Sequence, residues 1–161
     1  MYLQELEMIL ETINSTVQEV YGNRLVSVAV FGSVGRRTPR PDSDIDLLIV
    51  SEDLPQGRLK RMAEFAQVEE MVEARVANFT QIKPDLSPVI KTREEVLQGS
   101  FLFLDLTEDS RILYDRGGFL ARYLDELKEK LRRMGAKRIR CGGTWCWVLK
   151  EDYRLGEVIE I

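Results

Sequence analysis

Apolar residues recur every three to four positions in three stretches of the chain, the spacing that gathers side chains on one face of a helix. These stretches predict helices over residues 2–21, 58–79 and 119–134. Gly22-Asn23 follows the first and Gly135 follows the third, and glycine is a common residue just beyond the end of a helix.

Runs of apolar residues with little polar interruption predict the strands. Residues 25–31 and 45–50 predict two buried strands, and residues 111–114 predict a shorter one. Residues 81–90 predict a further strand, and its two prolines place it at the edge of a sheet or over a bulge.

Shorter signals complete the pattern of elements. Thr92-Arg93-Glu94-Glu95 matches a capping box and predicts a short helix, and Ser100 begins another through Leu106. Residues 137–161 predict a hairpin with Gly142-Gly143 at its turn and two tryptophans on one face of its second strand.

The order of these elements is helix, strand, strand, helix, strand. This order predicts an α/β (α+β) protein in which helices pack on a mixed sheet. A chain of 161 residues is about one domain long. We expect a single domain, with residues 1–118 as the core and residues 119–161 as a C-terminal helix and hairpin packed on it.

Composition excludes several classes of function. The chain has no histidine, which excludes histidine-ligated zinc, Ser-His-Asp hydrolysis and a histidine general base. A net charge of −4 argues against broad nucleic-acid binding, and the lysines and arginines of residues 128–140 are typical of a solvated helix face. Because no apolar run could span a bilayer and the acidic N-terminus is unlike a signal peptide, we expect a cytoplasmic protein. Cys141 and Cys146 are interpreted as reduced thiols, with a bridge between them as the alternative.

Two aspartates alternate at the start of the second strand, in Ser43-Asp44-Ile45-Asp46-Leu47. Residues two apart in a strand point to the same face, so Asp44 and Asp46 project together while Ile45 enters the core. Two adjacent carboxylates repel each other, and a divalent cation offsets that cost. Mg²⁺ often lies between carboxylates and substrate phosphates, so the pair predicts a magnesium site.

A Gly-Ser turn precedes these acids at the end of the first strand. Gly32 allows a sharp turn and the close approach of a phosphate, and Ser33 offers a hydroxyl and a backbone N–H. If residues 34–38 begin a helical turn, its free N–H groups face the same point. An anion cradle beside a carboxylate pair suits a metal-bound nucleoside triphosphate.

Gly32-Ser33, Arg36, Thr38 and Ser43-Asp44-Ile45-Asp46-Leu47 together resemble the signature of the DNA polymerase beta-type nucleotidyltransferase superfamily. The resemblance covers about residues 26–50 and is closest to the minimal single-domain members. It implies the polymerase beta-type nucleotidyltransferase fold, a mixed sheet flanked by helices. One departure is Arg37, which stands where the family usually has a small residue, often glycine.

The resemblance also implies the site residues. Asp44, Asp46 and a third acid, Asp85, would hold two Mg²⁺ ions and carry the catalysis, with Asp105 as the rival for the third position. The residues that would bind ATP or another NTP are Gly32, Ser33, Arg36, Arg37 and Ser43. The two arginines suit phosphate through their forked donors, or else form a solvated basic turn.

We expect an Mg²⁺-dependent nucleotidyltransferase that moves an NMP, AMP foremost, from an NTP to a hydroxyl acceptor. Without histidine, proton removal falls to Asp85 or to the metal alone. The minimal members often act with a helical HEPN-type partner, as antitoxins that adenylylate it. Two alternatives are a non-catalytic nucleotide-binding antitoxin that masks its partner and a small-molecule transferase of the antibiotic-modifying kind. The sequence leaves the acceptor, the base and the oligomeric state open, self-association included.

Overall fold

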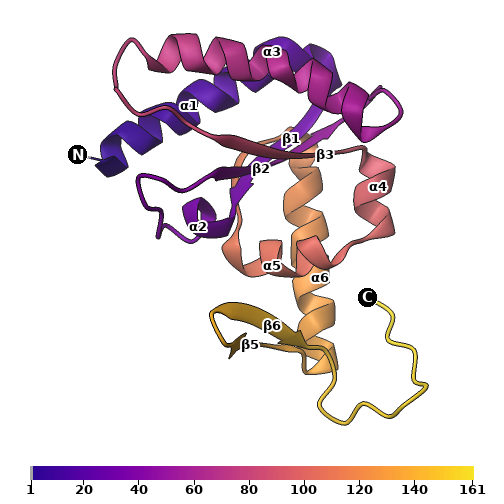
Figure 1. Cartoon of the computed structure of the whole chain (residues 1–161). Coiled ribbons are helices and arrows are strands. Elements are labelled where there is room, and N and C mark those ends of the chain that lie inside the picture. The colour runs from indigo at the N-terminus through magenta and orange to yellow at the C-terminus, as the bar shows by residue number, and fades with distance from the viewer. Residues whose placement is uncertain (1) are drawn as a thin grey trace.

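A computed structural model describes residues 2–161 (Figure 1). Its helices are α1 (Tyr2–Tyr21), α2 (Gly32–Gly35), α3 (Arg58–Val76), α4 (Arg93–Gln98), α5 (Phe101–Asp109) and α6 (Phe119–Met134), with 3₁₀ turns η1 (Gly22–Arg24) and η2 (Arg116–Gly118). Its strands are β1 (Leu25–Phe31), β2 (Ile45–Ser51), β3 (Leu86–Lys91), β4 (Arg111–Asp115), β5 (Lys137–Cys141) and β6 (Thr144–Val148).

Four strands form a mixed sheet in the order β3-β2-β1-β4. β1 pairs antiparallel with β2 and with β4, whereas β2 pairs parallel with β3. The predicted mixed sheet is therefore confirmed, and so is the edge position of the strand that carries prolines. Pro88 is tolerated there because an edge strand leaves one row of backbone N–H groups without a ladder partner.

The alternation along β2 gives the sheet two apolar faces. Ile45, Leu47 and Ile49 pack with α1 and α3, while Leu48 and Val50 pack with α5 and α6. Figure 1 shows α1 and α3 on one side of the sheet and α4, α5 and α6 on the other. No helix within residues 2–161 is both long and apolar enough to cross a membrane.

The C-terminal hairpin forms a separate two-stranded sheet beside α5 and α6 (Figure 1). Its turn brings Cys141, at the end of β5, to Cys146 in β6, and the two form a disulfide with Cα atoms 5.8 Å apart. The expectation of two reduced thiols is thus wrong, because the hairpin places the residues side by side. Residues 149–161 continue past α6 without forming a strand, so the hairpin ends earlier than predicted.

Several element bounds differ from the predicted ones. α3 ends at Val76, because Phe79 and Thr80 donate to its carbonyl oxygen in a closing turn. The strand predicted over 81–90 begins only at Leu86, after a segment in which Pro84 cannot donate a ladder hydrogen bond. α5 runs three residues beyond the predicted Leu106. Asp85 and Asp44 consequently precede their strands by one residue.

Candidate active site

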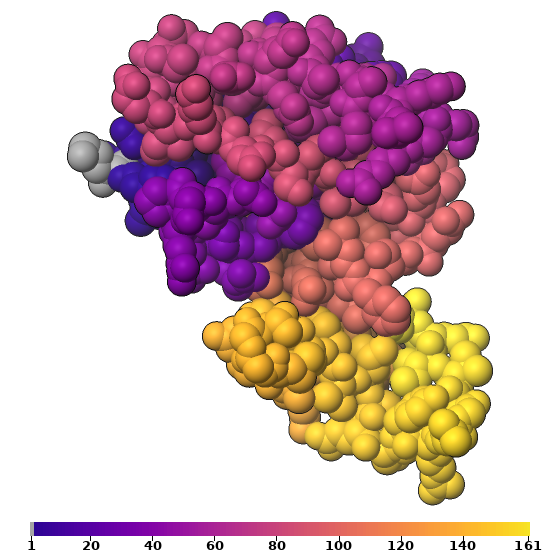
Figure 2. All heavy atoms as spheres, viewed as in Figure 1, coloured from indigo at the N-terminus to yellow at the C-terminus, as the bar shows by residue number. Residues whose placement is uncertain are grey.

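A cavity of about 750 Å³ opens between the segment after β1 and the C-terminal hairpin. Figure 2 shows the surface hollowed there, between the purple loop and the orange hairpin. The lining residues come from β1 and the following loop, the start of β2, α5 and the hairpin: Phe31, Gly32, Ser33, Arg36, Thr38, Arg40, Ser43, Asp46, Leu102, Asp105, Asp109, Arg140, Gly143, Thr144 and Trp145. A volume of this size accommodates a nucleotide.

The predicted Gly-Ser turn forms one wall of this cavity. Gly32 has a φ of +64°, in the left-handed region that favours glycine, and a Cβ there would overlap the carboxylate of Asp46. Arg36 then donates its backbone N–H to the Gly32 carbonyl at 3.0 Å, which forms the helical turn α2. Glycine thus brings the turn directly against the acid.

Asp46 is half-buried in β2, opposite Phe31 of β1. Burial raises the pKa of its carboxyl above the ordinary value, the charge of Asp44 raises it further, and Arg36 opposes both effects. Asp44 itself is exposed. The residues therefore fit Mg²⁺ in two respects: the donors are hard carboxylate oxygens, and a bound cation would relieve the cost of ionising Asp46.

Asp85, the predicted third acid, is connected to the Asp44–Asp46 pair only through its backbone. The Asp85 carbonyl accepts a hydrogen bond of 2.8 Å from the N–H of Ile45, which holds Asp85 at the same end of the sheet as Asp44. Asp85 lines a smaller cavity beside Glu69 and Glu73 of α3. Among residues 2–161, no three acidic, histidine or cysteine side chains gather closely enough to form a metal site.

Asp105, the rival third acid, lines the main cavity from α5. Its Oδ1 accepts a hydrogen bond of 3.0 Å from the indole Nε1 of Trp147. This contact holds the hairpin to α5 and gives Asp105 a structural role in the protein as folded.

Asp109 is a site residue that the sequence reasoning missed. Its buried carboxylate accepts from Arg36 Nη1 at 3.0 Å and from both Nη atoms of Arg138 at 2.8 and 3.0 Å. A Cβ on Gly35 would overlap the Asp109 carbonyl, so the turn after β1 packs directly against the end of α5. Asp109 therefore connects the Gly-Ser turn to the hairpin.

The two remaining residues predicted to bind the nucleotide, Ser43 and Arg37, line different cavities. Ser43 lines the main cavity, and its hydroxyl accepts from the Arg40 N–H at 2.9 Å. Arg37 lines a different cavity, beside Leu6 and Leu10 of α1. Its φ of +61° explains why a small residue suits this position, and its side chain is not among those lining the main cavity.

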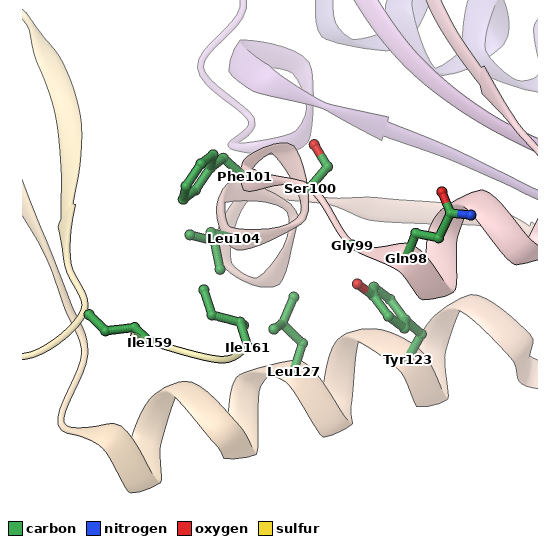
Figure 3. Close-up of a pocket in the computed structure, with 9 residues that line it drawn as sticks. All are labelled: Gln98, Gly99, Ser100, Phe101, Leu104, Tyr123, Leu127, Ile159 and Ile161. Atoms are coloured by element: carbon green, nitrogen blue, oxygen red, sulfur yellow. The ribbon is translucent and has the colours of Figure 1, made fainter. Parts of the chain in front are cut away.

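A second cavity, of about 250 Å³, lies between α5, α6 and the C-terminal segment (Figure 3). In Figure 3, Ile161 points between Leu104 and Leu127, with Tyr123 farther along α6. Its lining includes no Asp, Glu, Lys or Arg side chain. This cavity combines apolar packing with the uncharged polar groups of Gln98, Ser100 and Tyr123.

Comparisons with known proteins identify the family of the chain. The model of the nucleotidyltransferase domain family matches residues 10–103. A proposed protein adenylyltransferase of Methanocaldococcus jannaschii is 26% identical over 132 residues, which cover 80% of this chain and 85% of that protein. The protein adenylyltransferase MntA of Thermococcus cleftensis is 35% identical over 72 residues, 45% of this chain and 66% of that protein.

Among solved structures, a toxin-antitoxin structure with AMP-PNP contains a chain that is 14% identical. The match covers 76% of this chain and 92% of that one, with a TM-score of 0.45. The family match is the finding that assigns the chain, because it spans more than half of the sequence and includes the Gly-Ser turn, Asp44, Asp46 and Asp85. The chain therefore belongs to the nucleotidyltransferase domain family and is a nucleotidyltransferase.

Proposed function

We propose that this nucleotidyltransferase moves AMP from ATP to a hydroxyl group of a partner protein, with pyrophosphate as the leaving group and with Mg²⁺ held at Asp44 and Asp46. The observation that carries the proposal is the contact between Gly32 and the Asp46 carboxylate in one cavity. It brings a turn suited to phosphate against an acid suited to the metal of a metal-bound triphosphate.

Asp44 and Asp46 are the residues that would hold the metal. Asp85, whose side chain lines the cavity beside Glu69 and Glu73, would have to turn toward them to act as the third ligand. When bound, Mg²⁺ neutralises charge on the triphosphate and lowers the pKa of an acceptor hydroxyl. The raised pKa of Asp46 supports this assignment, because a group that is costly to ionise gains most from a cation beside it.

The chain's own groups would hold the rest of the nucleotide. Ser33 offers its hydroxyl and backbone N–H to the β- and γ-phosphates, and Ser43 lines the same cavity. Arg36 brings positive charge to this wall, held in place by Asp109. Asp85 would take the proton from the acceptor hydroxyl as general base.

A protein acceptor is supported by the names of the two relatives, both protein adenylyltransferases. We propose a helical HEPN-type partner, with this chain as its antitoxin. The alternative of a non-catalytic masking subunit would be favoured by an Arg37 side chain that blocks the phosphate-binding turn. Arg37 lines the cavity beside α1, so its side chain leaves the proposed nucleotide site open.

The test is incubation of the chain, Mg²⁺ and α-³²P-labelled ATP with the protein that co-purifies with it from its source. We expect label on that protein, and none with Asp46→Ala or in EDTA. Asp152→Ala is a matched control, since it removes an exposed aspartate outside the cavity and should leave labelling intact. Neutralisation of the partner by Asp46→Ala without any labelling would favour the masking role instead. Label found only on a small molecule would favour the antibiotic-modifying kind.

A further inference from the structure

The two tryptophans of β6 have different environments. Trp147 packs against the core beneath the hairpin and donates its indole N–H to Asp105. Trp145 is 37% exposed and lines the cavity that contains Ser33 and Asp46. Packing therefore accounts for Trp147 but leaves Trp145 with an aromatic surface at the site.

Two guanidinium groups of β5 lie on the Trp145 ring. The Cζ atoms of Arg138 and Arg140 are 4.3 and 4.7 Å from its centroid, within the range of a cation–π contact. Arg138 is occupied by Asp109, whereas Arg140 forms no ion pair with any residue of the described range 2–161 and lines the cavity. Arg140 thus lies over the Trp145 ring where both residues line the cavity, and this aromatic and positively charged pair is called the Trp145–Arg140 platform.

The platform is fixed in position by contacts that lie outside it. Arg138 binds Asp109 through two hydrogen bonds, and Trp147 binds Asp105, so that β5 and β6 are each tied to α5. The hairpin lies beyond residues 10–103, the part that matches the family model. It provides the wall of the cavity formed by Arg140, Thr144 and Trp145.

We propose that the Trp145–Arg140 platform stacks the nucleobase of the bound NTP. This inference rests on the proposed function in one respect, that the triphosphate lies at Gly32 and Ser33. If the triphosphate of the NTP contacts the Gly-Ser turn, its nucleobase is the aromatic group that can contact the hairpin. Nucleobases stack on aromatic rings and on arginine guanidinium planes, and the positive charge of Arg140 also favours an anionic ligand.

Stacking of this kind tolerates every base, because each base has a π-face. The Trp145 ring should therefore contribute equally to ATP and GTP affinity, and it should contribute nothing to the binding of inorganic tripolyphosphate, which has no base. These two expectations distinguish base stacking from a structural disturbance that would weaken the binding of all three ligands.

The experiment measures binding of ATP, GTP and tripolyphosphate, each with Mg²⁺, by titration calorimetry on the full chain. Trp145→Ala should weaken ATP and GTP by about tenfold and leave tripolyphosphate unchanged. Trp145→Phe should restore most of the ATP affinity. Tyr153→Ala is the matched control, because it removes an exposed aromatic side chain outside the cavity and should change none of the three.

The outcomes separate this inference from the proposed function. Unchanged ATP affinity in Trp145→Ala would overturn the platform, and so would equal losses of ATP and tripolyphosphate, which would indicate a structural role for the hairpin. Failure of the unsubstituted chain to bind either ligand would instead overturn the proposed triphosphate site. Circular dichroism and thermal unfolding check that Trp145→Ala is folded. Trp145→Leu, which keeps an apolar side chain without a π-face, repeats the test where the alanine variant is not folded.

Discussion

Gly32 and Asp46 are in such close contact that the hydrogen on the Gly32 α-carbon cannot be replaced by a methyl group without overlapping the Asp46 carboxylate. The contact joins the end of β1 to the start of β2 across an antiparallel pair, in which Phe31 faces Asp46. A backbone that could bind phosphate and a carboxylate that could bind metal are thereby fixed relative to each other.

Gly32→Ala should abolish nucleotidyl transfer, because the new methyl group would displace Asp46 as well as strain the left-handed backbone. The strain costs about 1–2 kcal/mol of unfolding free energy, and the displacement of Asp46 adds to the loss of activity. Transfer rates and thermal unfolding measure the two effects. Gly22→Ala is the control, since its φ of +59° imposes the same strain with no atom near the added Cβ. Equal activity losses in both variants would contradict the role of the contact.

The pKa of Asp46 has a direct consequence for stability. Because burial and Asp44 raise this pKa in the folded protein, folding favours the protonated carboxyl. The contribution of Asp46 to stability is thus greatest below the ordinary aspartate pKa, and it falls as pH rises through the raised value. We expect Asp46→Asn to be more stable than the unsubstituted chain at neutral pH, with the difference disappearing in acid.

Urea unfolding between pH 3 and pH 8 measures this difference. Asp44→Asn should give a smaller gain of the same sign, because it removes the second cause of the raised pKa and leaves the first, burial, in place. Both variants should lose transfer activity while remaining folded. A stability loss in Asp46→Asn at neutral pH would show that this aspartate is structural.

Local sequence pattern predicts the elements that carry the metal and phosphate candidates. α1, β1 and α6 have the predicted bounds, because their apolar spacing and their terminal glycines act within a few residues. The Gly-Ser turn and the alternating Asp44 and Asp46 are equally local features, and a pattern three to fifteen residues long is enough to indicate them.

The Asp109 contacts could not be predicted in this way. Arg36 and Asp109 are 73 residues apart in sequence, and Arg138 is a further 29 residues away. The contact between Arg36 and Asp109 depends on all the elements from β2 to α5, and the approach of Arg138 depends on β4 and α6, which lie between Asp109 and β5. The only sequence signal was Gly35, whose lack of a Cβ permits the contact with the Asp109 backbone, and a lone glycine does not identify its neighbour.

Replacing Asp109 should lower the unfolding free energy much more than replacing Arg36. Asp109→Ala leaves Arg138, whose side chain is 12% exposed, without its principal partner, and we expect a loss of about 3 kcal/mol of unfolding free energy. Arg36 is 35% exposed, so Arg36→Gln should cost under about 1 kcal/mol. Chemical denaturation measures both values. A comparable loss of stability in the two variants would contradict the view that Asp109 chiefly anchors the hairpin.

Arg36→Gln should still weaken binding of Mg²⁺–ATP and of tripolyphosphate, since it removes positive charge from the wall that would hold the phosphates. Titration calorimetry provides the measurement, and Arg37→Gln is the matched control on the neighbouring residue. Because Arg37 lines the cavity beside α1, its replacement should leave both affinities unchanged. An equal effect of the two variants would mean that the basic turn acts as a whole.

The identity of the third acid is tested by Asp85→Asn and Asp105→Asn. Each substitution keeps the shape of the side chain and removes its charge, and an amide at position 105 can still accept the hydrogen bond from Trp147. If Asp85 completes the metal site and takes the acceptor proton, Asp85→Asn should reduce transfer by at least about 100-fold, the usual contribution of a general base. Asp105→Asn should retain transfer within a few-fold.

The opposite result would make Asp105, which lines the main cavity, the third acid of the metal site. The role of Asp85 would then be limited to the hydrogen bond that its carbonyl accepts from Ile45. If both variants were fully active and Asp46→Asn were inactive, Asp44 and Asp46 would be the only acidic residues that the reaction needs.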